Sequence, residues 1–232
     1  ILDDVSMTAK KHEITVIIGS SGCGKTTLLK HLIRLYVPWS GSIQIFGSEI
    51  TDMDEPEFNE LLLNIGVLFQ NGALLNSINV AENVAIPLEQ HTNLPYNIIK
   101  RLIRVKLNLV ELDHAFLKMP SELSGGMRKR AALARAIALD PALLLCDEPS
   151  AGLDPITLEA LDQLILKMRD ELGMSIVIVT HDLASIYRIA DRVIFLDDGK
   201  VLFEGTLKET LDCGIDKVNA FFKKGAGLAS HP

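Results

Sequence analysis

The sequence has few cysteines, no basic excess and no long apolar run. Its three cysteines, at positions 23, 146 and 213 of 232 residues, fit neither a metal-ligand spacing nor a disulfide framework. No stretch approaches the length of a transmembrane helix, and no signal peptide is recognisable. Acidic residues outnumber basic ones, 30 to 23, whereas nucleic-acid binders usually show a basic excess. We therefore expect a protein of a reducing compartment that binds no nucleic acid and reaches any membrane through a partner.

The length and the 48% hydrophobic content suit one α/β domain with a sizeable core. Residues 1–70 and 140–232 alternate apolar β-branched runs with helical patterns, whereas residues 71–139 are mostly helical in pattern. This change in the apolar pattern predicts a single domain, in which a helical subdomain at 71–139 is inserted into an α/β core. The pattern also predicts a strand within Ile1–Lys11 and a short helix at Ser77–Ala85 that ends before Pro87.

A glycine-rich stretch carries the first functional signal. Residues 19–27 fit the pattern G-x-x-x-x-G-K-[ST], between a predicted buried strand at 13–18 and a predicted helix. In that context backbone N–H groups and the helix N-terminus close around phosphate oxygens; an ordinary tight turn is the alternative. Lys25 would reach the β- and γ-phosphates, and Thr26 would hold Mg²⁺. The predicted nucleotide-binding residues of this stretch are Gly19, Ser20, Ser21, Gly22, Cys23, Gly24, Lys25, Thr26 and Thr27.

Four polar residues follow predicted strands of the same sheet. Asp147 and Glu148 end one apolar run, and Gln70 and His181 follow two others. Ligands of parallel α/β sheets bind at the carboxyl ends of strands, which is where the glycine loop also lies. Asp147 suits the Mg²⁺ shell, and Glu148 suits a general base for the attacking water. Gln70 could contact both the metal and that water, and His181 could donate to the γ-phosphate. Each could instead be structural, as a turn cap, a surface amide or a core histidine, but their shared edge favours a site.

The stretch Leu123-Ser-Gly-Gly-Met127 completes the pattern. With it, the chain resembles the ATP-binding subunits of ABC transporters over nearly its whole length. The motifs stand in that family's order: Walker A at 19–27, Q-loop at Gln70, signature at Leu123–Met127, Walker B at Leu143–Glu148, D-loop at Ser150–Asp154 and switch His181.

The resemblance implies a RecA-like P-loop core with an antiparallel β subdomain, and hydrolysis of ATP with Mg²⁺. It implies two copies packed head to tail, so that Ser124, Gly125, Gly126 and Met127 of one copy cap the ATP held by Lys25 of the other, with Asp154 coupling the sites. An integral membrane permease on the cytoplasmic face of the inner membrane would be the partner. The implied catalytic residues are Glu148, His181, Gln70 and Lys25, and the implied Mg²⁺ residues are Thr26, Gln70 and Asp147.

Local strings indicate a narrower branch. The chain looks like the ATPases of Mce-linked lipid transporters, of which the Mla phospholipid system is the best-known example. This resemblance implies lipid as cargo and an Mce-type lipid-binding protein as a further partner. It rests on Phe69–Leu75 (Phe-Gln-Asn-Gly-Ala-Leu-Leu), on Asn83–Pro95, and on the stretch from Met119 to Ala136 that includes Met127 where most ABC subunits have Gln.

Other readings remain open. A transporter of another cargo, a DNA-repair or chromosome ABC ATPase, and a P-loop kinase share parts of the pattern, but a kinase would not explain residues 124–126 or His181. The family's adenine-stacking aromatic residue would precede Ile1 and is not assigned. Cys23 is predicted to be a reactive thiol, because it lies beside Lys25 and a helix N-terminus. The basic run at 128–130 with Arg135 predicts a solvated helix face, or a contact with an acidic patch on the membrane partner.

Overall fold

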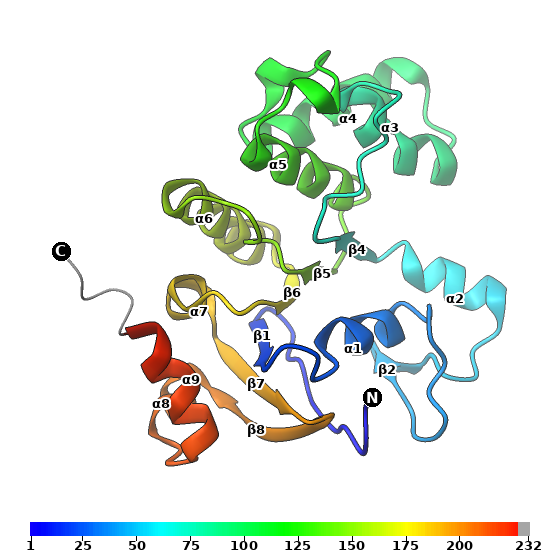
Figure 1. Ribbon diagram of the computed structural model, residues 1–232. Helices are drawn as coiled ribbons and strands as arrows, with labels where there is room; N and C mark the ends of the chain where they lie inside the picture. The colour runs from blue at the N-terminus through cyan, green and yellow to red at the C-terminus, as the bar shows by residue number, and fades with distance from the viewer. Residues whose placement is uncertain (227–232) are drawn as a thin grey trace.

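The computed structural model describes residues 1–226, and a six-stranded sheet forms their centre (Figure 1). The strands lie in the order β4-β5-β6-β1-β7-β8, parallel except for β8, which pairs antiparallel with β7. This mixed α/β architecture confirms the predicted fold class. The strands are β1 (Ile14–Gly19), β4 (Ile65–Leu68), β5 (Leu143–Asp147), β6 (Ser175–Val179), β7 (Arg192–Asp197) and β8 (Lys200–Thr206).

The central strands β1, β5 and β6 form from apolar runs, which allow burial on both faces. All of β1 is buried, and its side chains divide between two layers. Val16 and Ile18 join the larger core cluster, whereas Ile17 joins a second cluster with Leu28 and Leu29 of α1. The helices around the sheet are α1 (Lys25–Leu32), α2 (Glu55–Leu62), α6 (Pro155–Leu172), α7 (Leu183–Ile189), α8 (Leu207–Asp212) and α9 (Asp216–Ala226).

Three helices form a separate layer at the top of Figure 1: α3 (Val80–His91), α4 (Tyr96–Leu109) and α5 (Gly125–Ala136). Two single 3₁₀ turns, η1 (Asp113–Ala115) and η2 (Pro120–Glu122), connect α4 to α5. Helix α3 packs on both α4 and α5, and α5 also reaches β4 and α6. The end of α5 that carries the signature sequence is thereby fixed relative to the sheet.

The predicted end of α3 before Pro87 is wrong, because the helix continues through this proline to His91. A proline inside a helix removes one backbone hydrogen bond, and here two features offset that loss. Asn79 and Glu82 form a capping box at the start, with bonds of 2.8 and 2.9 Å. Val84 and Leu88 are buried on the core face.

The predicted strand at Ile1–Lys11 is also wrong. This segment has no strand pairing, and Asp3 N–H donating to Gly199 O at 2.9 Å is a lone bond to the turn between β7 and β8. Its spaced apolar residues instead pack beside the second core cluster, where Leu2, Val5 and Met7 are half-buried. The antiparallel pairs of the described chain are β7 with β8 and the short pair β2 (Gln44–Ile45) with β3 (Ser48–Glu49).

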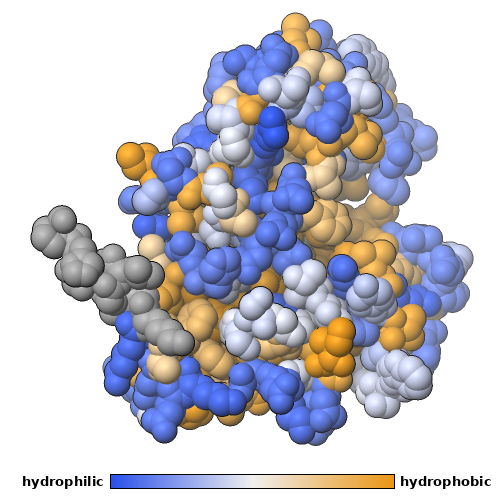
Figure 2. All heavy atoms as spheres, viewed as in Figure 1, coloured by the Kyte–Doolittle hydropathy of each residue, from blue (hydrophilic) through white to orange (hydrophobic). Residues whose placement is uncertain are grey.

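Hydrophilic residues cover most of the face in Figure 2, and apolar residues appear in small separate groups. Within residues 1–226, no helix combines the length and the apolar character needed to cross a bilayer.

Candidate functional site

The glycine loop at residues 19–24 connects β1 to α1 in the predicted strand-loop-helix arrangement. Two glycines are required by its geometry. Gly19 has φ +147°, and a Cβ there would stand 1.9 Å from Leu196 O; Gly24 has φ +106° and caps α1. The ammonium of Lys25 donates to Gly19 O at 3.0 Å and to Ser20 O at 2.8 Å, so the cation lies against the loop. The loop therefore presents an amine and a helix N-terminus to the same small region.

A hydroxyl and a carboxylate meet beside this loop. Thr26 Oγ1 donates to Asp147 Oδ1 at 3.1 Å, which links the first turn of α1 to the end of β5. Within the described residues no three or more His, Cys, Asp or Glu side chains gather as a metal cage. One hydroxyl and one carboxylate still fit Mg²⁺, which commonly takes one or two carboxylates and completes its shell with water and substrate phosphates.

Glu148 follows β5 with its side chain largely buried, at 14% exposure. Its Oε2 lies 2.9 Å from His181 Nδ1, which follows β6, so the structure brings these two predicted residues together. The backbone of Glu148 is left-handed, with φ +46°, and its N–H donates to Val179 O at 2.8 Å. A non-glycine residue held in this conformation stores strain, a feature that clusters at functional sites. Neither side chain caps a helix: the carboxylate of Asp147 accepts from Thr26, and that of Glu148 lies against His181.

Gln70 follows β4 with an exposed side chain, and its backbone carbonyl accepts a hydrogen bond from the ammonium of Lys129. Lys129 also lies 3.4 Å from Glu148 O, so it touches the backbone of two predicted site residues. The predicted solvated basic face is wrong for Lys129, which is 6% exposed. The burial of Lys129 could have been predicted from helical spacing, because Ala132 and Leu133 follow it by three and four residues on the buried face of α5.

The signature stretch opens α5 as predicted, with Ser124 as N-cap accepting from Met127 N–H at 3.3 Å. Gly126 packs tightly on α6, since a Cβ there would stand 2.3 Å from Thr157 Cγ2. The carboxylate of Asp154 caps α6 and accepts from the Thr157 hydroxyl at 2.5 Å. These hydrogen bonds hold the pKa of Asp154 below its ordinary value. Roles of these residues toward a second copy stay predictions.

Cys23 does not have the exposure expected of a reactive thiol, because it is only 5% exposed beneath the loop. Its Sγ lies 3.7 Å from Lys25 Nζ.

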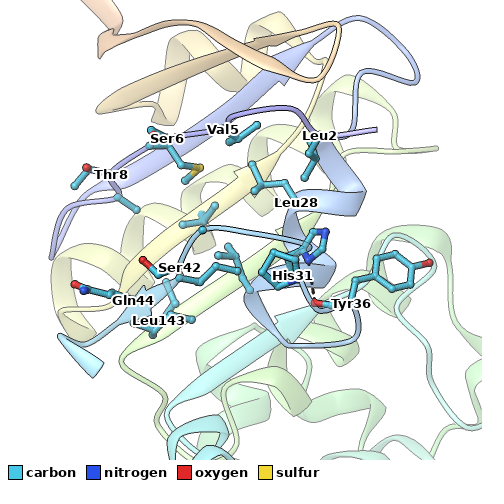
Figure 3. Close-up of a pocket in the computed structure, with 18 of the residues that line it drawn as sticks. Leu2, Val5, Ser6, Thr8, Leu28, His31, Tyr36, Ser42, Gln44 and Leu143 are labelled. Carbon is cyan, nitrogen blue, oxygen red and sulfur yellow. Dashed lines mark hydrogen bonds between the residues drawn. The ribbon is translucent and has the colours of Figure 1, made fainter. Parts of the chain in front are cut away.

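A hollow of about 1650 Å³ opens on another side of α1. Figure 3 shows part of its lining, with Leu2 and Val5 of the N-terminal segment beside Leu28 of α1, and His31 beyond it. Of the predicted site residues only Thr27 borders it, and His31 Nδ1 is engaged with Tyr36 O at 2.9 Å. The polar residues that suit phosphate chemistry therefore lie at the strand ends and not in this hollow.

Comparison with known proteins agrees with the geometry. Residues 2–151 match the ABC transporter family. The chain is 43% identical to the intermembrane phospholipid transport system ATP-binding protein MlaF of Haemophilus influenzae, over 96% of this chain and 84% of the relative. It is 45% identical to the "Probable ribonucleotide transport ATP-binding protein mkl" of Mycobacterium tuberculosis, over 79% of this chain and 51% of the relative. The dimeric, ADP- and Pi-bound ATP-binding cassette MJ0796 superposes with a TM-score of 0.81 at 33% identity, covering 89% of this chain and 90% of that one.

Proposed function

This chain belongs to the ABC transporter family and is one of its ATP-hydrolysing subunits, and on that premise we propose that it drives the movement of phospholipid between membranes. The observation that carries the cargo is the 43% identity to an intermembrane phospholipid transport ATP-binding protein, which extends over 96% of this chain. Such an extent covers the helical layer as well as the nucleotide-binding core.

In the proposed reaction, Glu148 accepts a proton from the water that attacks the γ-phosphate, while its partner His181 donates to that phosphate. The 2.9 Å contact between the two side chains supports their joint action on one group. Lys25 binds the phosphates together with the loop at 19–24. Thr26, Asp147 and Gln70 would hold Mg²⁺, which neutralises phosphate charge when bound.

The proposed active unit contains two copies of the chain, head to tail. Ser124, Gly125 and Gly126 of one copy cap the ATP bound by the partner, and Met127 follows in the first turn of α5. Two facts support this arrangement: the neighbouring cassette structure is a dimer, and Ser124 begins a twelve-residue helix whose N-terminus attracts anions. Asp154, which caps the helix that packs on Gly126, is suited to couple the two sites.

We place the protein on the cytoplasmic face of the inner membrane, held there by an integral membrane permease, with an Mce-type lipid-binding protein in the same assembly. The likeness to MlaF supports the permease, whereas the Mce-type protein is proposed from the local sequence strings at 69–75, 83–95 and 119–136.

The test is to purify the complex from native membrane through a tag on this subunit and to analyse its proteins and bound lipid by mass spectrometry. Co-purification of a permease, an Mce-type protein and phospholipid supports the full proposal. A permease without phospholipid removes the lipid cargo and keeps the transporter, as for a ribonucleotide system of the kind named for the mycobacterial relative. Absence of any membrane partner contradicts the proposal.

A further inference from the structure

A buried lysine connects the two strand ends that carry Gln70 and Glu148. Lys129 lies in the second turn of α5, and its ammonium donates to Gln70 O and lies 3.4 Å from Glu148 O. Gln70 lies two residues after β4, and Glu148 directly follows β5, which is the neighbouring strand of the sheet. One cation thus holds both strand ends.

Burying an ammonium is unfavourable unless it is paired and hydrogen-bonded. Burial accordingly lowers the pKa of Lys129, against the opposing effect of Cys146, Glu148 and Asp147. Its ammonium donates to two backbone carbonyls, while the charges of Glu148 and Asp147 act on it without a hydrogen bond from these carboxylates in the described residues. A lysine used only to fill space at this position could be replaced by an apolar residue of similar length. Its two polar contacts suggest a more specific role.

The backbone conformation of Glu148 indicates what the specific role of Lys129 is. Its left-handed φ of +46° persists only where the surroundings determine the conformation. Its N–H is held by Val179 O at 2.8 Å, and its carbonyl faces Lys129 at 3.4 Å and Ala151 N at 3.2 Å. Lys129 is therefore one of three groups that contact the backbone of Glu148, the residue whose carboxylate lies beside His181.

Helix α5 makes further contacts with the segment after Gln70. Arg135 donates to Gly72 O and to Ala73 O, each at 2.7 Å. The segment at 70–73 is therefore attached to α5 at three carbonyls, and the opposite end of the same helix begins with the signature residue Ser124. A movement of α5 would therefore be transmitted by Lys129 to the backbones of Gln70 and Glu148 at the two strand ends.

We propose that Lys129 is a positioning residue for ATP hydrolysis. Its buried ammonium holds the backbone carbonyls of Gln70 and Glu148 close to each other and connects both to the signature helix α5. The inference rests on the proposed roles of Gln70 and Glu148. It predicts a defect in turnover, because the lysine acts on the residues that activate water and does not contact the phosphate loop.

The experiment measures steady-state phosphate release and thermal unfolding of the reconstituted complex. Lys129→Met removes the charge and keeps the length, and Lys129→Arg restores a cation. We expect Lys129→Met to lower kcat at least tenfold with a KM for ATP within threefold of wild type, and Lys129→Arg to recover kcat to within threefold. Arg130→Met is the matched control, since this neighbour pairs with Glu111 at 2.7 Å in the helical layer, and its kcat should stay within twofold.

A kcat within threefold of wild type in folded Lys129→Met overturns the inference, as does a loss confined to KM or a failure of Lys129→Arg to recover activity. Lys129→Gln, which removes the charge and keeps a neutral amide NH₂ group, decides the case if the Met variant does not fold. It should then lose turnover without losing ATP binding. Glu148→Gln is measured in parallel. If that variant keeps its turnover, the proposed catalytic role of Glu148 is wrong; if it loses turnover while Lys129→Met does not, only the inference fails.

Discussion

Replacing Glu148 with glutamine tests the proposed water-activating group with little structural disturbance. The substitution keeps the size of the side chain and removes its charge. The side chain is 14% exposed and its Oε2 lies 2.9 Å from His181 Nδ1. A glutamine amide can keep a hydrogen bond at this position, so the fold and the loop at 19–24 should remain intact.

The expected size of the effect follows from the chemistry that is removed. A positioned general base contributes about 10²–10⁴-fold to a rate. Turnover of Glu148→Gln should therefore fall by this factor, which corresponds to about 3–5 kcal/mol in activation free energy. ATP affinity should change by less than about threefold, because binding depends on Lys25 and the loop backbone and not on Glu148.

The assay is phosphate release by the complex, with ATP binding measured separately by equilibrium titration. Glu60→Gln on α2 is the control, since this glutamate is exposed and its described hydrogen bonds run through its backbone carbonyl, which the substitution keeps. Turnover of Glu148→Gln within threefold of wild type would refute the assignment of Glu148. A parallel loss of ATP binding would show that the substitution damages the phosphate site instead.

Three further predictions follow from buried contacts. Gly126→Ala should lower turnover at least tenfold, because its Cβ would stand 2.3 Å from Thr157 Cγ2 and displace the start of α5; unchanged phosphate release would contradict this. Asp162→Ala should lower stability by about 3 kcal/mol, or Tm by about 6–12 °C in calorimetry, because Asp162 is 1% exposed and pairs with Arg188; a shift below about 2 °C would contradict it. Cys146 should resist alkylation at pH 8 in the native protein, because burial raises the pKa of its thiol to about 12, and rapid labelling found by peptide mass mapping would contradict that.

The sequence predicts the central strands and the helix starts well, because their signals are local. Apolar runs give β1, β5 and β6 to within a residue or two. The glycine loop follows β1, Asp147 ends β5, and His181 stands two residues after β6. Asp54 and Asp154 are the N-caps of α2 and α6, each with a proline in the first turn, which is the residue pattern that favours a helix start. The meeting of Glu148 with His181 follows from the rule that parallel strands end at one edge.

Predictions from the sequence are wrong where tertiary packing outweighs a local structural preference. Pro87 stays inside α3, because burial of the helix and its capping box offset one missing hydrogen bond. The segment at Ile1–Lys11 has strand-like spacing but no partner strand beside it in the described chain. Lys129 lies in a basic run that is typical of a solvated face, and this charge pattern concealed its helical spacing to the buried Ala132 and Leu133 on the side of α5 that packs against β4.

The most direct test of the account measures ATP-dependent movement of labelled phospholipid between donor and acceptor membranes by the reconstituted complex, with wild type and Glu148→Gln compared. The account predicts lipid movement that requires ATP and falls with Glu148→Gln by the same factor as phosphate release, while bound phospholipid still co-purifies with the variant. Phospholipid movement that continues undiminished in Glu148→Gln, or ATP hydrolysis by wild type without any phospholipid movement, would contradict it.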